Sequence, residues 1–158
     1  MRYVLAASAE RTTDACRRAL QGRSGVEFRV GSVPETGSDC DAAIFSFPLA
    51  HERYGGIPRP GAAQLLENQR DDGVPGLILA TPPAPPRTSA GTGEEVEEHS
   101  FHVLSACATE FLREFPELGD DAMILIHMEA AGIDHRNIDA SLRGVLRFLS
   151  QDRPASGE

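Results

Sequence analysis

Residues 41–58 read Asp-Ala-Ala-Ile-Phe-Ser-Phe-Pro-Leu-Ala-His-Glu-Arg-Tyr-Gly-Gly-Ile-Pro, and this stretch decides how the rest of the chain is interpreted. Its apolar run from Ala42 to Phe47 is long enough for a buried strand and too short for a helix. Pro48 ends that strand because proline has no N–H for a ladder, and a polar loop then leads to Gly55–Gly56. A helical pattern follows from Ala62 to Arg70.

The order of strand, glycine loop and helix is the order found at phosphate-binding sites. Glycine lets backbone N–H groups approach an anion, and a helix N-terminus supplies unpaired donors and a partial positive charge. An ordinary turn from strand to helix also uses glycine for its dihedral angles, and a lone Gly-Gly pair is weak evidence. Both interpretations of Gly55–Gly56 therefore stay open on this stretch alone.

The composition predicts one globular domain over residues 1–150 and a disordered tail over residues 151–158. The chain has 158 residues, of which 41% are hydrophobic and 25% charged. It contains no apolar run of membrane-spanning length and no signal-peptide pattern, so we expect no membrane and a cytoplasmic location. A net charge of −9 argues against a nucleic-acid polymer as partner. All fifteen basic residues are Arg, as in a GC-rich genome, and we expect a bacterial source.

The cysteines and histidines give no metal signature. Cys16, Cys40 and Cys107 are scattered, so they predict neither a zinc site nor a disulfide framework, and we expect reduced thiols. His99 and His102 lie three residues apart and could share a helix face with nearby glutamates, Glu95 and Glu98. A solvated acidic start of a helix explains that group as well, and we expect no metal.

Apolar runs alternate with helical patterns along the chain. We expect strands over residues 2–8, 26–30, 42–47, 76–80 and 123–128, and helices that end near 21 and span 62–70, 94–115 and 137–150. Three strands are continuously apolar, which predicts an α/β three-layer α/β/α sandwich with a mostly parallel or mixed central sheet. The strands at 26–30, 42–47, 77–80 and 124–128 should be buried neighbours. A ligand should then lie beyond the C-terminal strand ends, near loops 31–34, 48–58 and 128–136. The Pro/Gly/Ser-rich loop 81–93 is either mobile or a lid.

From Val26 to Leu149 the chain resembles the macrodomains that bind ADP-ribose, in particular the branch with an extra N-terminal strand and helix. The segments that carry the resemblance are Gly31-Ser32-Val33, Asp41 to Pro48, Gly55-Gly56-Ile57, Leu79 to Pro82 and Ala130 to Asp134. The third and fifth correspond to the two phosphate loops of the family. The resemblance implies a macrodomain-like fold without a cofactor and a ligand site formed by Ser32, Val33, Pro48, Tyr54, Gly55, Gly56, Ile57, Ala131, Gly132, Ile133 and Asp134.

Four positions depart from the family pattern. Pro48 replaces the asparagine that holds the distal ribose and helps to position the catalytic water, and Ser32 replaces the acid that contacts adenine. Pro58 replaces an acid that often follows the first glycine loop. Asp134 replaces a glycine, and a carboxylate at ~4 Å from a phosphate costs on the order of 4 kcal/mol at an effective dielectric of about 20.

Three functions follow as hypotheses. The first is binding of ADP-ribose or a related nucleoside diphosphate, and the second is a degenerate domain that binds a protein partner. The third is an ADP-ribosyl hydrolase with non-standard catalytic residues, in which His51, Glu52 or Asp134 would take over catalysis. His51, Glu52 and Arg53 lie in the expected binding loop, and any of these three could reach a ligand. A plain loop surface explains these three residues equally well. His127, on an apolar strand, is more typical of a hydrogen-bonded core histidine than of a catalyst.

Overall fold

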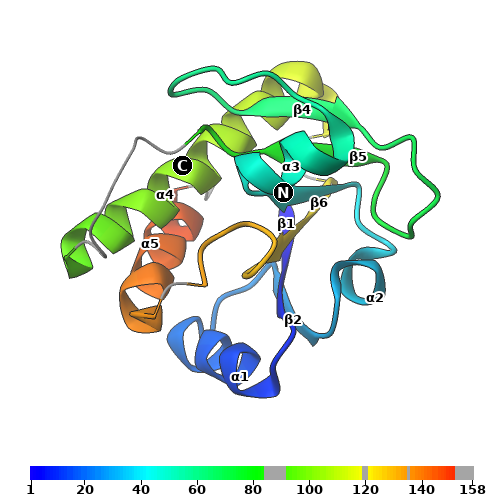
Figure 1. Ribbon diagram of the computed structural model, residues 1–158. Helices are drawn as coiled ribbons and strands as arrows, with labels where there is room; N and C mark the ends of the chain where they lie inside the picture. The colour runs from blue at the N-terminus through cyan, green and yellow to red at the C-terminus, as the bar shows by residue number, and fades with distance from the viewer. Residues whose placement is uncertain (84–91, 119–120, 135, 152–158) are drawn as a thin grey trace.

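The computed structural model describes residues 1–83, 92–118, 121–134 and 136–151. In this part of the chain, six strands form one sheet in the order β2-β1-β6-β3-β5-β4 (Figure 1). Five strands run parallel, and β4 pairs antiparallel with β5 at one edge. The strands are β1 (Arg2–Ala7), β2 (Val26–Val30), β3 (Ala42–Phe45), β4 (Gln64–Glu67), β5 (Leu77–Ala80) and β6 (Met123–His127).

Helices cover both faces of the sheet (Figure 1). One face packs against α1 (Glu10–Ala19), α4 (Gly93–Glu114) and α5 (Ile138–Gln151). The opposite face packs against α2 (Val33–Gly37) and α3 (Phe47–Tyr54). A short 3-10 helix, η1 (Pro116–Leu118), precedes β6. The α/β class and the mixed sheet predicted from the sequence are therefore confirmed.

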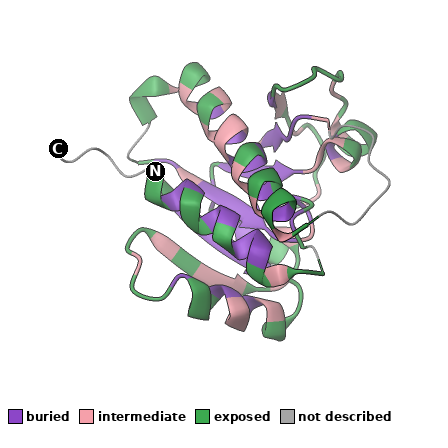
Figure 2. Cartoon of the chain, turned by 90° about the vertical axis from the view of Figure 1, so that its left-hand side faces the viewer, coloured by how far each residue is buried: buried purple, intermediate pink, exposed green. Residues whose placement is uncertain are grey.

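The continuous apolar runs are explained by burial of the central strands on both faces. In β6, Ile126 points into the core beneath α4 and α5, and Leu125 points into the core beneath α2 and α3. Figure 2 shows buried residues on the central strands and on the helix sides that face them, with exposed residues outside. A parallel sheet with two covered faces needs apolar residues at successive positions. The strands predicted around β1, β3, β5 and β6 are confirmed for this reason.

The prediction of a helix over residues 62–70 is wrong, because residues 64–67 form strand β4. Its side chains separate by face: Leu65 packs with the core under α4, and Leu66 packs with the core under α3. Gln, Leu and Glu are good helix formers. Pairing with β5 and burial on two faces override that local preference, as they commonly do at strands.

The loop predicted after Pro48 is also wrong, because the chain continues directly into α3. The strand ends at Phe45, two residues earlier than predicted, and Pro48 occupies the second position of the helix. Proline fits a first helical turn, where its missing N–H would have no intrahelical partner.

The strand predicted at residues 26–30 exists, but it is not a neighbour of β3. It pairs with β1 and lies at the sheet edge, where it is only partly buried. The first helix begins at Glu10, with Ala9 as its N-cap residue. Thr13 lies inside the helix, with its hydroxyl donating to the Ala9 and Arg29 carbonyls at 3.3 Å each.

The contact between α4 and α5 depends on small residues. The Ser100 hydroxyl on α4 donates to the Ser141 carbonyl on α5 at 3.0 Å, and Gly144 of α5 lies against the same turn of α4. Ala108 and Leu112 of α4 are only partly buried. The positions buried in α4 are Val96, Ser100, Val103, Leu104, Cys107 and Phe111.

None of the helices in the described ranges is both long and apolar enough to span a membrane.

The three thiols should be unreactive in the folded protein. All three cysteines are buried; burial raises the pKa of Cys16 to about 12 and of Cys40 to about 11, and it also raises the pKa of Cys107. Since the thiolate is the reactive form, a disulfide reagent at pH about 8 should label the native protein very slowly and all three thiols rapidly in denaturant. Fast labelling of one thiol without denaturant would contradict the buried positions. The tail predicted for residues 151–158 begins at Gln151, which is instead the last residue of α5. Residues 152–158 and most of loop 81–93 lie outside the described residues.

Candidate functional site

The helix that follows β3 and the helices that follow its two neighbouring strands lie on opposite faces of the sheet. After β3 it enters α3 on one face, whereas after the flanking strands β6 and β5 it leads to α5 and α4 on the other face. In open α/β sheets, ligands bind in the crevice that such a change of face leaves beyond the carboxyl ends of the strands. We call this region the β3 crevice and define it by Ser46, Phe47, Thr81, Ala130 and Gly132.

Hydrogen bonds fix the strand ends that form the β3 crevice. The Ser46 N–H donates to the Ala130 carbonyl at 2.7 Å, which joins the end of β3 to the turn after β6. The Phe47 N–H donates to the Thr81 hydroxyl oxygen at 3.1 Å, which joins the start of α3 to the end of β5. Ser46 is the N-cap residue of α3, and its hydroxyl makes no capping bond. The Ser46 hydroxyl and the buried Thr81 hydroxyl therefore lie beside the N-terminus of α3.

Gly132 brings the turn after β6 close to β3. Its φ is +75°, and a Cβ added there would lie 3.0 Å from the Ser46 Cβ. Within the same turn, the N–H groups of Ala131, Gly132 and Ile133 donate to the carbonyls of His127, Glu129 and Met128. The backbone donors of the predicted second phosphate loop are therefore used within the turn itself.

The predicted first phosphate loop packs on β4 and not on the β3 crevice. The Ile57 N–H donates to Gln64 Oε1 at 3.0 Å, and Gln64 Nε2 donates back to the Ile57 carbonyl. A Cβ on Gly56 would lie 3.1 Å from Gln64 Oε1. Since β5 separates β4 from β3, the two glycine loops lie over different strands. In the described residues, the hydrogen bonds of the first loop go to Gln64 and His51, whereas the N–H groups of the second are used within its own turn.

The other predicted residues have structural contacts or face solvent. Ser32 is the exposed N-cap of α2, in a capping box with Glu35, and Val33 packs partly against the core beneath α2 and α3. The Tyr54 hydroxyl donates to Asp72 at 2.8 Å; burial and this bond raise the pKa of Tyr54 to about 12. Of the remaining positions, Pro48 and Asp134 are exposed, whereas Ala131 and Ile133 are buried.

The loop assigned to His51, Glu52 and Arg53 is instead the second half of α3, and all three residues are exposed. The His51 ring stacks on Phe47 with ring centroids 5.5 Å apart. Its Nδ1 lies 2.9 Å from the Gly56 carbonyl oxygen, so the imidazole links α3 to the glycine loop. The contact gives His51 a structural role next to the β3 crevice.

Sequence reasoning missed a polar cluster beside the β3 crevice, centred on Glu129. Its Oε1 accepts a hydrogen bond from the Ser8 N–H at 2.9 Å. His127 is buried, and its Nε2 lies 2.8 Å from the Gly31 carbonyl oxygen, so this nitrogen carries the proton. The prediction of a hydrogen-bonded core histidine is confirmed. The signal for Glu129 was its place just after an apolar strand, where functional side chains of α/β sheets gather.

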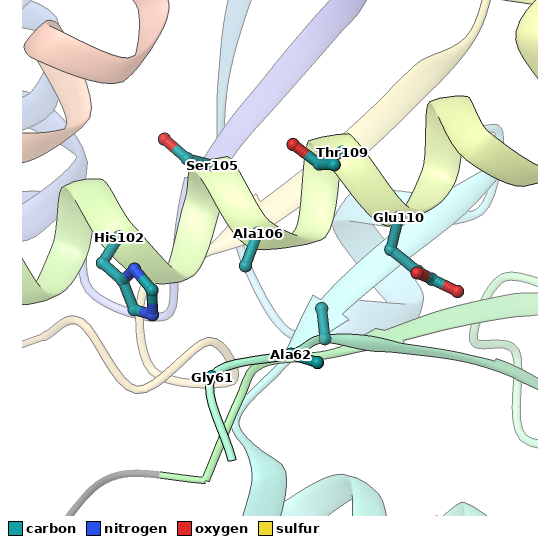
Figure 3. Close-up of a pocket in the computed structure, with 8 residues that line it drawn as sticks. Gly61, Ala62, His102, Ser105, Ala106, Thr109 and Glu110 are labelled. Carbon is teal, nitrogen blue, oxygen red and sulfur yellow. The ribbon is translucent and has the colours of Figure 1, made fainter. Parts of the chain in front are cut away.

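A separate cavity of about 340 Å³ lies between α4 and the stretch that enters β4. Figure 3 shows His102 and Ala106 of α4 pointing towards Gly61 and Ala62. The same wall carries Glu110, whose carboxylate is paired with Arg113 at 2.6 Å. Across the described ranges, no group of three or more His, Cys, Asp or Glu residues could hold a metal ion.

Comparison of the sequence with protein-family models and with curated proteins finds no match. The resemblance to macrodomains therefore remains a hypothesis, supported by the sequence motifs quoted above. The functional argument below starts from the geometry of the β3 crevice.

Proposed function

We propose that the protein binds a nucleoside diphosphate such as ADP-ribose at the β3 crevice. The observation that carries the proposal is the change of helix face on both sides of β3, where Gly132 allows the turn after β6 to pack on Ser46. The N-terminus of α3 begins at the same point, and the positive end of its dipole favours a phosphate group. Its Phe47 N–H is already used by Thr81, and Pro48 has no N–H. Hydroxyl groups of Ser46 and Thr81 are the adjacent side-chain donors. Local donors of this kind can bind a small anion although the whole chain carries a net charge of −9.

A calorimetric titration with ADP-ribose, NAD, ADP and AMP tests this proposal. We expect the diphosphates to bind more tightly than AMP, because the second phosphate adds charge at the helix N-terminus. Chemical-shift changes should include the amides of Ser46, Thr81 and Gly132. No binding by any of the four compounds, or shifts confined to other parts of the chain, would reject the proposal.

Replacing Asp134 by glycine should raise the affinity for ADP-ribose. Asp134 is exposed and lies two residues after Gly132, so its carboxylate adds negative charge near the proposed diphosphate position. Discounting the repulsion for solvent screening, we expect an increase of about threefold to tenfold, larger at low salt. Asp134→Asn is the matched variant, since it removes the charge and keeps the size. An affinity that does not change in either variant would place the carboxylate outside the site.

Hydrolysis of ADP-ribosylated protein should be weak or absent. In the macrodomain resemblance, Pro48 stands where an asparagine positions the attacking water, and Pro48 is an exposed residue without a side-chain donor. Loss of a positioning group commonly lowers turnover by orders of magnitude. A release assay beside an active macrodomain tests this expectation. Comparable turnover by both proteins would contradict it and would direct attention to His51, Glu52 or Asp134.

A protein-interaction function is the second candidate. It is favoured by the internal hydrogen bonding of both glycine loops, since Ile57, Gly132 and Ile133 already use their N–H groups. A domain that has lost its ligand would have no need of free donors there. The titration above separates the two candidates, because only the first predicts binding of a nucleotide.

A further inference from the structure

The turn after β6 presents two different groups at neighbouring places. Its Gly132 packs on Ser46 at the end of β3, and the Gly132 N–H donates to the Glu129 carbonyl at 3.1 Å. The Glu129 side chain extends the other way, towards β1, where Oε1 accepts the Ser8 N–H. One rigid turn therefore places a carboxylate beside the β3 crevice, on its β1 side.

A hydrogen bond orients the carboxylate of Glu129, but most of its acceptor sites are not used. Its Oε1 lies 3.5 Å from His127 Nδ1, and the His127 ring is held in turn by the Gly31 carbonyl at 2.8 Å. Because Nε2 carries the imidazole proton, Nδ1 offers a lone pair and gives Glu129 no hydrogen bond. A carboxylate has acceptor sites for about four donors. Within the described ranges Ser8 supplies the one hydrogen bond found for this carboxylate, whose side chain remains 36% exposed.

An acceptor of this kind selects a neutral donor on the ligand. An ionised carboxylate would repel a phosphate, so Glu129 would not meet the diphosphate itself. The groups of a nucleoside diphosphate that can donate are the hydroxyls of its ribose and the exocyclic amine of adenine. A sugar hydroxyl lies nearer to the diphosphate, and an acidic residue beside the phosphate site takes the ribose hydroxyl in many dinucleotide-binding sheets.

We infer that Glu129 recognises a hydroxyl group of the nucleoside ribose through Oε2, which makes the protein selective for ribonucleotides. The inference rests on the proposed function, because it needs the diphosphate at the β3 crevice. Ser8 is then the positioning residue, because its N–H holds the carboxylate from behind.

The test measures the affinities of ADP, 2′,3′-dideoxy-ADP and inosine diphosphate for the wild-type protein, Glu129→Gln and Glu129→Ala. Wild type should bind ADP about tenfold to a hundredfold more tightly than the dideoxy compound, the range for a hydrogen bond to a charged group. Glu129→Ala should abolish that preference. Glu129→Gln, whose amide oxygen can still accept the Ser8 N–H, should keep the fold and reduce the preference at least about threefold. Glu117→Gln, on the 3-10 helix that precedes β6, is the matched control and should behave as wild type.

The outcomes are distinct. Equal binding of ADP and the dideoxy compound by wild type, or a preference that Glu129→Ala retains, overturns the role of Glu129 and leaves the proposed function standing. If Glu129→Ala instead removes a preference for ADP over inosine diphosphate, the carboxylate reads the base and the inference is wrong. If none of the nucleotides binds, the proposed function and this inference fall together. Thermal unfolding of each variant shows whether a lost preference reflects a lost fold.

Discussion

Replacing Gly144 by valine is expected to lower the free energy of unfolding by about 3 kcal/mol or more. A Cβ at this position would collide with the Glu97 carbonyl oxygen and the Ser100 hydroxyl, and it would lie 3.0 Å from the Phe101 N. Two of these atoms belong to the backbone of α4, so a side-chain rotation cannot relieve the contact. The helices would have to separate, which would expose apolar residues such as Val103 and Val145 that pack in this core.

Urea denaturation followed by circular dichroism measures the effect. Gly76→Val is the matched control, since Gly76 has no heavy atom within 4 Å of its added Cβ and no left-handed φ. Its stability should change by less than about 1 kcal/mol. A Gly144→Val protein as stable as Gly76→Val would show that α4 and α5 do not pack as closely as described.

The sequence predicts the central strands well because their burial leaves a pattern that survives without tertiary information. Leu125 and Ile126 face opposite cores, so β6 must be apolar at consecutive positions. The sequence pattern of strand β4 does not predict a strand, for a physical reason. Its residues are good helix formers over a short run, and pairing with β5 holds them in an extended strand. In that strand Leu65 and Leu66 face opposite sides of the sheet.

The candidate site is less predictable, because it depends on contacts between distant residues. The sequence indicates that ligands should meet the loops after β3 and β6, and the β3 crevice lies there. It does not show that α3 intervenes after Ser46, nor that the Gln64 amide pairs with Ile57 and holds the first glycine loop on β4. Gly144 could have been noticed, since an isolated glycine in a helical pattern commonly marks a close contact.

Replacing Gly132 by alanine is expected to lower the affinity for ADP-ribose by about tenfold to a hundredfold, while most of the protein stays folded. Two costs arise at this position. The φ of +75° is unfavourable for any residue with a Cβ, by about 1–2 kcal/mol. The added methyl group also lies 3.0 Å from the Ser46 Cβ, so the turn after β6 must move away from the end of β3. A shift of about 1 Å at a binding site is enough for losses of this size.

Gly22→Ala separates the two costs. Gly22 has a similar φ of +84°, yet a Cβ there has no heavy atom within 4 Å, and the residue follows the C-terminal end of α1. Both variants should lose a similar amount of stability from backbone strain, and only Gly132→Ala should lose affinity. Calorimetry with ADP-ribose at fixed salt, beside thermal unfolding of both variants, measures these effects. If the two variants bind equally well, contact between Gly132 and Ser46 does not shape the ligand site, and the β3 crevice loses its main structural support.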